Sequence, residues 1–309
     1  MKLFLKHSTV ALTTAIAANS IALAEQTAAP QWSAEYGGSV EAGYEYDSTL
    51  NVADLDQSSA SADNAALLKA GLDAKWRYGA TTLSAGYDYS NRNYADSDSF
   101  DVELNQFSAD LSHNFAPVTV GINYHYADAQ LDDKALLDIR QSSLYASKLF
   151  DNRVLLRGAV IDRSKQFDER VERNANAIGG SFDGYLFSND AKRYLALGYT
   201  VEEEDATIDS LDFVGHSGRL TAANKFTLFD RDNQVKLQFK YGFRDYTESE
   251  SELGFTRVDE KADSSLAWIT RWTNAISTET KVSYGDYNSN LATANYDETL
   301  VSFGVKAEF

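Results

Sequence analysis

The sequence ends on VSFGVKAEF, Val301 to Phe309, in which apolar residues alternate with small or polar ones without a break. Alternation with a period of two places successive side chains on opposite faces of a β-strand. One face of this segment is apolar and ends on the aromatic ring of Phe309, although the mean hydropathy of the whole chain is negative. The segment therefore predicts a strand in a sheet that is apolar on one face only.

The same pattern recurs along the chain. It appears in ALLKAGLDAKWRYG (66–79), TTLSAGYDYS (81–90), PVTVGINYHYA (117–127) and QVKLQFKYGFR (234–244). These segments are longer than the ~5–6 residues of a typical soluble strand. They match the ~9–11 residues that a tilted strand needs to cross a membrane.

About fourteen such segments can be read from end to end. They are 32–46, 65–78, 81–93, 102–115, 117–128, 139–150, 153–163, 176–188, 193–204, 214–229, 234–246, 262–273, 276–288 and 297–309. The connections between them alternate between short turns and long polar loops, the long ones being 47–64, 94–101, 129–138, 164–175, 205–213, 247–261 and 289–296. Short turns at one end and long loops at the other are typical of an outer-membrane barrel. The predicted fold is an all-β, antiparallel up-and-down transmembrane barrel of about 14 strands, with short periplasmic turns and long acidic extracellular loops.

Aromatic residues lie near both ends of the predicted strands. Two girdles of such rings, one at each bilayer interface, are expected for a membrane barrel. The predicted girdle residues are Tyr44, Tyr46, Trp76, Tyr78, Tyr87, Phe115, Tyr124, Phe150, Phe229, Tyr241, Trp272 and Phe309. The alternative is a soluble sandwich or lipocalin-like barrel with an aromatic core, which does not explain why the short turns alternate with the long loops.

The first 24 residues predict a cleaved signal peptide, with Lys2 and Lys6 ahead of an apolar run that ends at Ala24. Residues 25–309 are predicted to form one barrel domain, reached by Sec-type export. Because Lys2 and Lys6 leave with the signal, the formal net charge of −18 becomes −20. This acidity excludes a generic nucleic-acid-binding protein, which needs a basic face. The absence of Cys excludes disulfides and lipid attachment at cysteine.

The last strand resembles the C-terminal signature of Gram-negative outer-membrane proteins, through Val301, Phe303, Val305 and Phe309. The resemblance implies recognition by the barrel-assembly machinery and a site among outer-membrane lipid and lipopolysaccharide.

The face opposite the apolar one is expected to line the lumen and carries charges of both signs. The predicted lumen or constriction residues are Glu41, Glu45, Lys69, Asp73, Lys75, Asp88, Arg157, Arg219, Lys236, Lys240, Arg244 and Arg271. Opposed charges across a water-filled pore would set a transverse field, whereas solvated ion pairs would only support the wall. The long loops add many acids, among them Asp54 and Asp56. These acids either concentrate cations at the mouth or keep the loops soluble.

Catalytic and metal-binding patterns are not found in the sequence. The mature chain has three histidines, His113, His125 and His216, with no G-x-S-x-G elbow and no His or Cys pair at ligand spacing. We therefore expect no enzyme activity, no metal and no cofactor.

Three functions remain open. Length, strand count and polar lumen resemble the monomeric OmpG-type porins, which implies passive diffusion of ions or small hydrophilic solutes. The stretch GYEYDSTLNVADL (43–55) is similar to the start of the barrel in surface-lipoprotein assembly modifiers, through Tyr46, Asp47, Ser48 and Asn51. That similarity implies an export or assembly barrel working with a periplasmic partner. A closed structural or adhesive barrel is the third reading.

Overall fold

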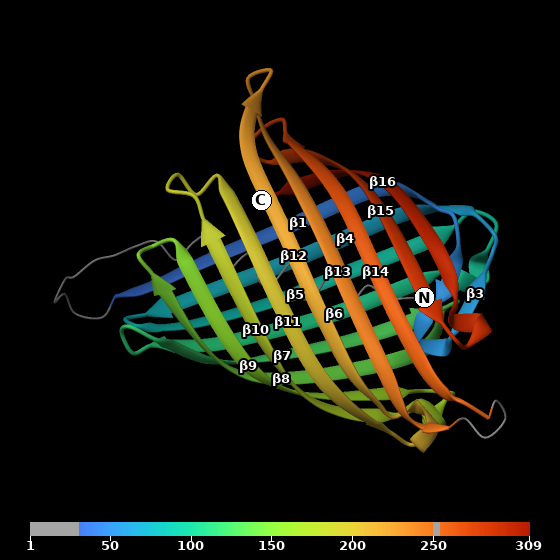
Figure 1. The fold of residues 1–309 in the computed structure, drawn as a ribbon. Coiled ribbons are helices and arrows are strands. Elements are labelled where there is room, and N and C mark those ends of the chain that lie inside the picture. Colours follow the sequence, from blue (N-terminus) through green and yellow to red (C-terminus); the bar gives the residue numbers. More distant parts are fainter. Residues whose placement is uncertain (1–30, 250–253) are drawn as a thin grey trace.

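The chain folds into a closed antiparallel β-barrel (Figure 1). The structure, a computed structural model, describes residues 31–249 and 254–309. The barrel strands in this part of the chain are β1 (Trp32–Asp47), β4 (Asp63–Tyr78), β5 (Thr81–Tyr94), β6 (Val102–Asn114), β7 (Thr119–Leu131), β8 (Lys134–Phe150), β9 (Val154–Phe167), β10 (Ala175–Phe187), β11 (Arg193–Ala206), β12 (Phe213–Leu228), β13 (Arg231–Ser249), β14 (Thr256–Arg271), β15 (Ile276–Ser289) and β16 (Tyr296–Glu308).

These 14 strands follow one another around the ring, and β1 closes it by pairing with both β4 and β16. The prediction of an antiparallel up-and-down barrel with about 14 strands is therefore confirmed. Short 3-10 turns stand in several connections: η1 (Ala53–Leu55), η2 (Asp98–Phe100), η3 (Val171–Arg173), η4 (Asp209–Leu211) and η5 (Ala292–Ala294). The predicted signal peptide, residues 1–24, lies outside the described residues.

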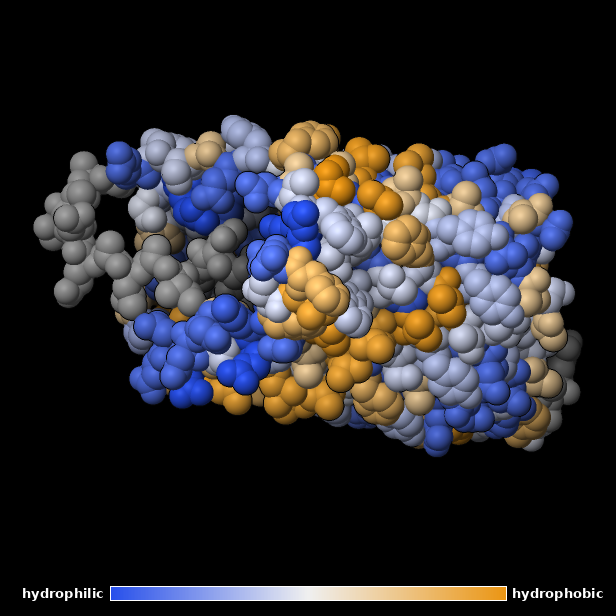
Figure 2. All heavy atoms as spheres, turned by 90° about the horizontal axis from the view of Figure 1, so that it is seen from above, coloured by the Kyte–Doolittle hydropathy of each residue, from blue (hydrophilic) through white to orange (hydrophobic). Residues whose placement is uncertain are grey.

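The outer wall of the barrel is apolar along its middle. Side chains such as Leu72, Phe182 and Phe303 are exposed on the outer face, and the small or polar residues between them face inward. Figure 2 shows hydrophobic residues gathered in the middle of the wall and hydrophilic residues towards both ends. Such a belt is stable against lipid and would be costly against water. A closed barrel with an outward apolar belt is the architecture of a Gram-negative outer-membrane protein.

The last residue takes part in closing the ring. Phe309 exchanges two backbone hydrogen bonds with Gly38 of β1, with N···O distances of 2.9 and 3.0 Å. The Phe309 ring covers Gly38, since a Cβ at Gly38 would lie only 2.5 Å from Cε2 of the ring. The seam between the first and last strands therefore depends on a glycine beneath a terminal aromatic ring.

The strands extend further at the loop end than the alternation predicted. Residues 129–138 were expected to form a long loop, but β7 runs to Leu131 and β8 begins at Lys134. A register shift between Ala129 and Gln130 explains the difference, because a bulge breaks the alternation that sequence reading relies on. A second feature that the pattern did not predict is a small sheet of β2 (Leu50–Val52) and β3 (Gln57–Ser59) between β1 and β4.

Candidate functional site: the lumen beneath an inward-folded loop

The connection between β1 and β4, residues 48–62, folds over the inside of the barrel mouth; we call it the lumen loop. It contains β2, η1 and β3, and Leu50 pairs with Ser59 while Val52 pairs with Gln57. The side chains of Leu50 and Val52 are each only 1% exposed. A surface loop that buries its apolar residues this fully is fixed to the barrel by packing.

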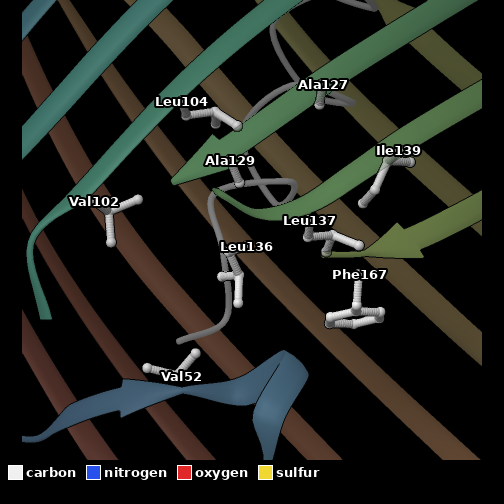
Figure 3. Packing of buried hydrophobic residues seen from close by; sticks show 9 residues of the cluster. All are labelled: Val52, Val102, Leu104, Ala127, Ala129, Leu136, Leu137, Ile139 and Phe167. Carbon is white, nitrogen blue, oxygen red and sulfur yellow. The ribbon is translucent and has the colours of Figure 1, made fainter. Parts of the chain in front are cut away.

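Two apolar contacts anchor the lumen loop. Val52 packs against residues at the loop ends of β6 to β9, namely Val102, Leu104, Ala127, Ala129, Leu136, Leu137, Ile139 and Phe167. Figure 3 shows Val52 pointing from the hairpin towards this cluster. Leu50 packs against Ala65 of β4 and Tyr94 of β5. Together the two side chains fix the loop to six neighbouring strands of the wall.

Asp56 ties the loop to more distant parts of the barrel. Its Oδ1 accepts a hydrogen bond from Nη2 of Arg257 on β14 at 2.6 Å, and its Oδ2 accepts two from Arg173 of η3 at 3.0 Å. Arg257 also pairs with Asp259 at 2.9 Å. Burial raises the pKa of Asp56, but the hydrogen bonds and charges of Arg257 and Arg173 outweigh burial and hold the pKa below its ordinary value. The carboxylate is therefore charged at neutral pH and joins two arginines.

The residues that resemble the export-barrel motif hold the start of the same loop. Asp47 accepts hydrogen bonds from the Thr49 backbone N–H and the Tyr94 hydroxyl, both at 2.9 Å. Ser48 Oγ accepts one from the Thr299 backbone N–H at 2.7 Å. Asn51 donates to Glu298 Oε1 on β16 at 2.5 Å and accepts from the Tyr296 hydroxyl at 3.1 Å. Here these polar residues fix the loop to β16 and β5.

A cavity of about 350 Å³ lies in the lumen, with Ala53 and Asp54 of the lumen loop in its lining. The strands that line it run from β7 to β14. Its charged lining comprises seven cations (Arg157, Arg163, Lys165, Arg219, Lys240, Arg244 and Lys261) and four acids (Asp54, Asp183, Glu202 and Asp263). The wall of the cavity therefore carries a positive balance, although the chain as a whole is strongly acidic.

Part of this wall is a row of residues that are paired with one another across neighbouring strands. Arg157 faces Asp183, Asp183 faces Gly198, Gly198 faces Arg219, and Arg219 faces Lys240 across successive strands. Arg219 reaches over the glycine and donates to Asp183 Oδ1 at 3.0 Å. A Cβ at Gly198 would lie 2.7 Å from that oxygen, so the ion pair requires the missing side chain.

Two arginines of the wall are stacked on rings instead. The Arg157 guanidinium lies 3.8 Å from the centroid of Tyr145, and the Arg244 guanidinium lies 4.4 Å from the centroid of Phe213. Tyr145 is itself fixed by donating its hydroxyl to Asp110 at 3.1 Å. A guanidinium with one face against a ring keeps its N–H edge available for an acceptor.

The predicted lumen residues thus divide into three groups. Arg157, Arg219, Lys240 and Arg244 are brought together around the cavity. Glu41 and Lys69 form an ion pair at 2.7 Å, and Glu45 pairs with Arg92 at 2.5 Å near the mouth.

The other predicted lumen residues are spread along the inner wall. Asp73 and Asp88 lie over the inward glycines of β1 and β4. Lys75 and Lys236 alternate with outward apolar residues on β4 and β13. Arg271 pairs with Glu308 at 3.4 Å at the turn end, away from the cavity. The acids of β1, β4 and β5 therefore lie on strands outside the run from β7 to β14 that lines the cavity.

Sequence reading missed Arg173 and Arg257, which hold Asp56, and the ring of Tyr145 beneath Arg157. Asp56 itself was predicted only as one acid of a solvated mouth. Asp56 and Arg257 are 201 residues apart, so no local pattern joins them.

The predicted girdle residues lie on the outer face. They are exposed, apart from Trp76, which is half-buried and donates to the Tyr36 hydroxyl at 3.2 Å. His113 contacts Thr81 at 2.9 Å and His216 contacts Tyr199 at 2.8 Å, and both His125 and His216 are among the residues that line the cavity. Within residues 31–249 and 254–309, no cluster of three His, Asp or Glu side chains could hold a metal. In those same ranges no helix has the length and apolar character to cross a membrane.

Comparison with known proteins finds solved structures with a similar fold. No family model matches the chain, and no curated protein sequence matches it. Among solved structures, it is similar to in-vitro folded OmpT, an outer membrane protein of Vibrio cholerae, with a TM-score of 0.52 and 9% identity over 93% of this chain and 100% of that one. It is also similar to an anion-selective porin from Comamonas acidovorans, with a TM-score of 0.50 and 10% identity over 90% of this chain and 100% of that one. At such identities the likeness is one of fold, and it agrees with the predicted outer-membrane barrel.

Proposed function

We propose that the protein is a porin-like channel of the outer membrane, through which ions or small hydrophilic solutes pass passively. The observation that carries the proposal is the charged cavity of about 350 Å³ inside a closed barrel. Fourteen strands lie between the ~8 that side chains can fill and the ~16–18 of an aqueous porin channel. A barrel of this size has room for a lumen, and a polar lining keeps that lumen wet.

The lumen loop sets the width of the proposed channel. It covers the cavity and is fastened on three sides, through Val52 to β6–β9, through Asn51 to β16 and through Asp56 to β14. The channel is therefore narrow while the loop is docked. Release of the loop would widen the mouth by removing a whole hairpin from the lumen.

The likeness in fold to the Comamonas porin supports this reading at the level of architecture. The proposal includes no catalytic step. Passage through the barrel-assembly machinery and contact with lipopolysaccharide also remain proposals, argued from the terminal strand and the apolar belt.

The test is single-channel recording of the refolded mature chain in a planar bilayer. A variant in which residues 50–59 are replaced by a Gly-Ser linker of equal length tests the same barrel without its hairpin. We expect small, steady conductance from the native chain and a larger one from the variant. If both fold, as judged by the heat-dependent gel shift of barrels, and neither conducts, the channel is refuted and a closed structural barrel takes its place.

A further inference from the structure

We infer that the basic wall of the lumen, on β9 and β12 to β14, is a binding site for a small organic carboxylate. This inference rests on the proposed channel and names the class of solute that it favours. It differs from one of the two readings of the acidic loops, in which their acids concentrate cations at the mouth.

The cations that line the cavity outnumber its acids. Two acids of the lining are already used, because Glu202 pairs with Arg163 at 2.9 Å and Asp183 pairs with Arg219 at 3.0 Å. Lys165 pairs with Glu204 at 2.7 Å. Among the described residues, neither Arg157 nor Arg244 is a partner in any of the ion pairs of the lining. The cavity therefore holds two guanidinium groups that form no direct ion pair with its acids.

Aromatic rings fix the orientation of these two arginines. Arg157 and Arg244 are backed by Tyr145 and Phe213, which orient the guanidinium planes without using their N–H groups. Arg157 stands next to Asp183 in the register, but the Asp183 carboxylate is hydrogen-bonded to Arg219 instead. A planar fork of N–H donors matches the two oxygens of a carboxylate.

The remaining lining indicates what else the solute carries. The wall around these cations presents short hydroxyl and amide side chains, namely Gln141, Ser143, Ser181, Thr200, Ser217 and Gln238. Such groups hydrogen-bond to hydroxyls and orient a ligand without charge. A polyhydroxylated acid fits this combination of cations and neutral polar groups.

The acidic loops do not oppose this selectivity as strongly as their composition suggests. Asp56 and Asp259 are held by Arg257, and Glu204 is held by Lys165. Asp54 is the loop acid that lines the cavity itself. The field inside the lumen is therefore set by the arginines and lysines of the wall.

The test measures ion selectivity and binding separately. Reversal potentials in a KCl gradient should show preference for chloride, and gluconate should block the current while sorbitol, its uncharged counterpart, should not. The Arg157→Gln/Arg244→Gln double variant should lower the chloride-to-potassium ratio about fourfold. It should also weaken gluconate block about tenfold. Arg271→Gln, a cation at the turn end, is the matched control and should change neither.

Preference for potassium, or block that the double variant leaves unchanged, would overturn the inference while the channel stands. Calorimetry of gluconate binding to the refolded barrel in nonionic detergent separates the two proposals. Arginine-dependent binding without conductance would refute the channel and retain the site. Inorganic phosphate is a further probe, and a phosphate that binds tenfold tighter than gluconate would contradict the assignment to carboxylates.

Discussion

Replacing Asp56 by Asn should release the lumen loop. The substitution keeps the size of the side chain but removes the charge that joins Arg257 and Arg173. These contacts are well shielded, as the side chains of Asp56 and Arg257 are only 12% and 5% exposed. The other anchors, which are the apolar contacts of Leu50 and Val52 and the hydrogen bonds of Asn51, stay in place.

The loss in the free energy of loop docking can be worked out from the hydrogen bonds of Asp56. The carboxylate accepts three bonds from the two guanidinium groups. Asparagine keeps one acceptor oxygen and turns an N–H₂ group towards one arginine. Arg257 retains its two bonds to Asp259, which limits the loss. Hydrogen bonds to charged groups contribute about 1.5–3 kcal/mol each, so a net loss of about 2–3 kcal/mol in docking is reasonable. This loss shifts the ratio of docked to undocked loop by roughly 30- to 140-fold.

Two assays read that ratio. The frequency of brief, wide openings in single-channel records should rise by this factor. Amide hydrogen exchange of residues 50–59 in micelles should accelerate by the same factor, while the barrel strands should not change. Asp132→Asn removes an exposed loop acid paired with Lys134 and is the control. A folded Asp56→Asn barrel whose loop protection stays within twofold of the native value would show that the clamp does not hold the loop.

Three further results are expected. Val52→Asp places an unpaired charge in a site that is 1% exposed, so the loop should stay undocked and mean conductance should rise; unchanged conductance would argue against the apolar anchor. Gly38→Val should expel the Phe309 ring and lower the yield of folded barrel in a gel-shift assay, whereas Gly218→Val, where a Cβ meets nothing within 4 Å, should not. Because the pKa of Asp56 is lowered from 3.8, its contribution to docking is present above that value and is lost as pH falls through the lowered pKa. The difference in opening frequency between the native chain and Asp56→Asn isolates this contribution. It should be constant from about pH 8 to about pH 5 and shrink below about pH 4, and a change in that difference near neutrality would point to another group.

Much of the barrel could be predicted because a strand with one apolar face repeats its pattern every two residues. The parity of Leu237 and Phe239 fixes the inward direction of Lys236 and Lys240 without any knowledge of the partners. The contacts between inward side chains could not be predicted in this way. Whether Arg219 meets Asp183 depends on strand register and on the space above Gly198, neither of which is visible in a single strand.

The inward folding of the lumen loop could not be predicted from the sequence for a related reason. Its strands are three residues long, which is too short for a periodic signal. Its partners are distant, since Asn51 and Glu298 are 247 residues apart. The acids of the loop were therefore predicted as solvated, whereas Asp56 is one of its anchors.

The long reach of the lumen loop has a consequence for the order of assembly. Asn51 and Asp56 follow the first strand, yet their partners Glu298 and Arg257 stand on β16 and β14. The loop cannot dock until the last strands are in place, even though it is synthesised first. Docking is thus a late event that reports a completed ring, and a chain truncated before β14 should expose this hairpin to proteases. A docked lumen loop would then indicate that all strands of the barrel are in place.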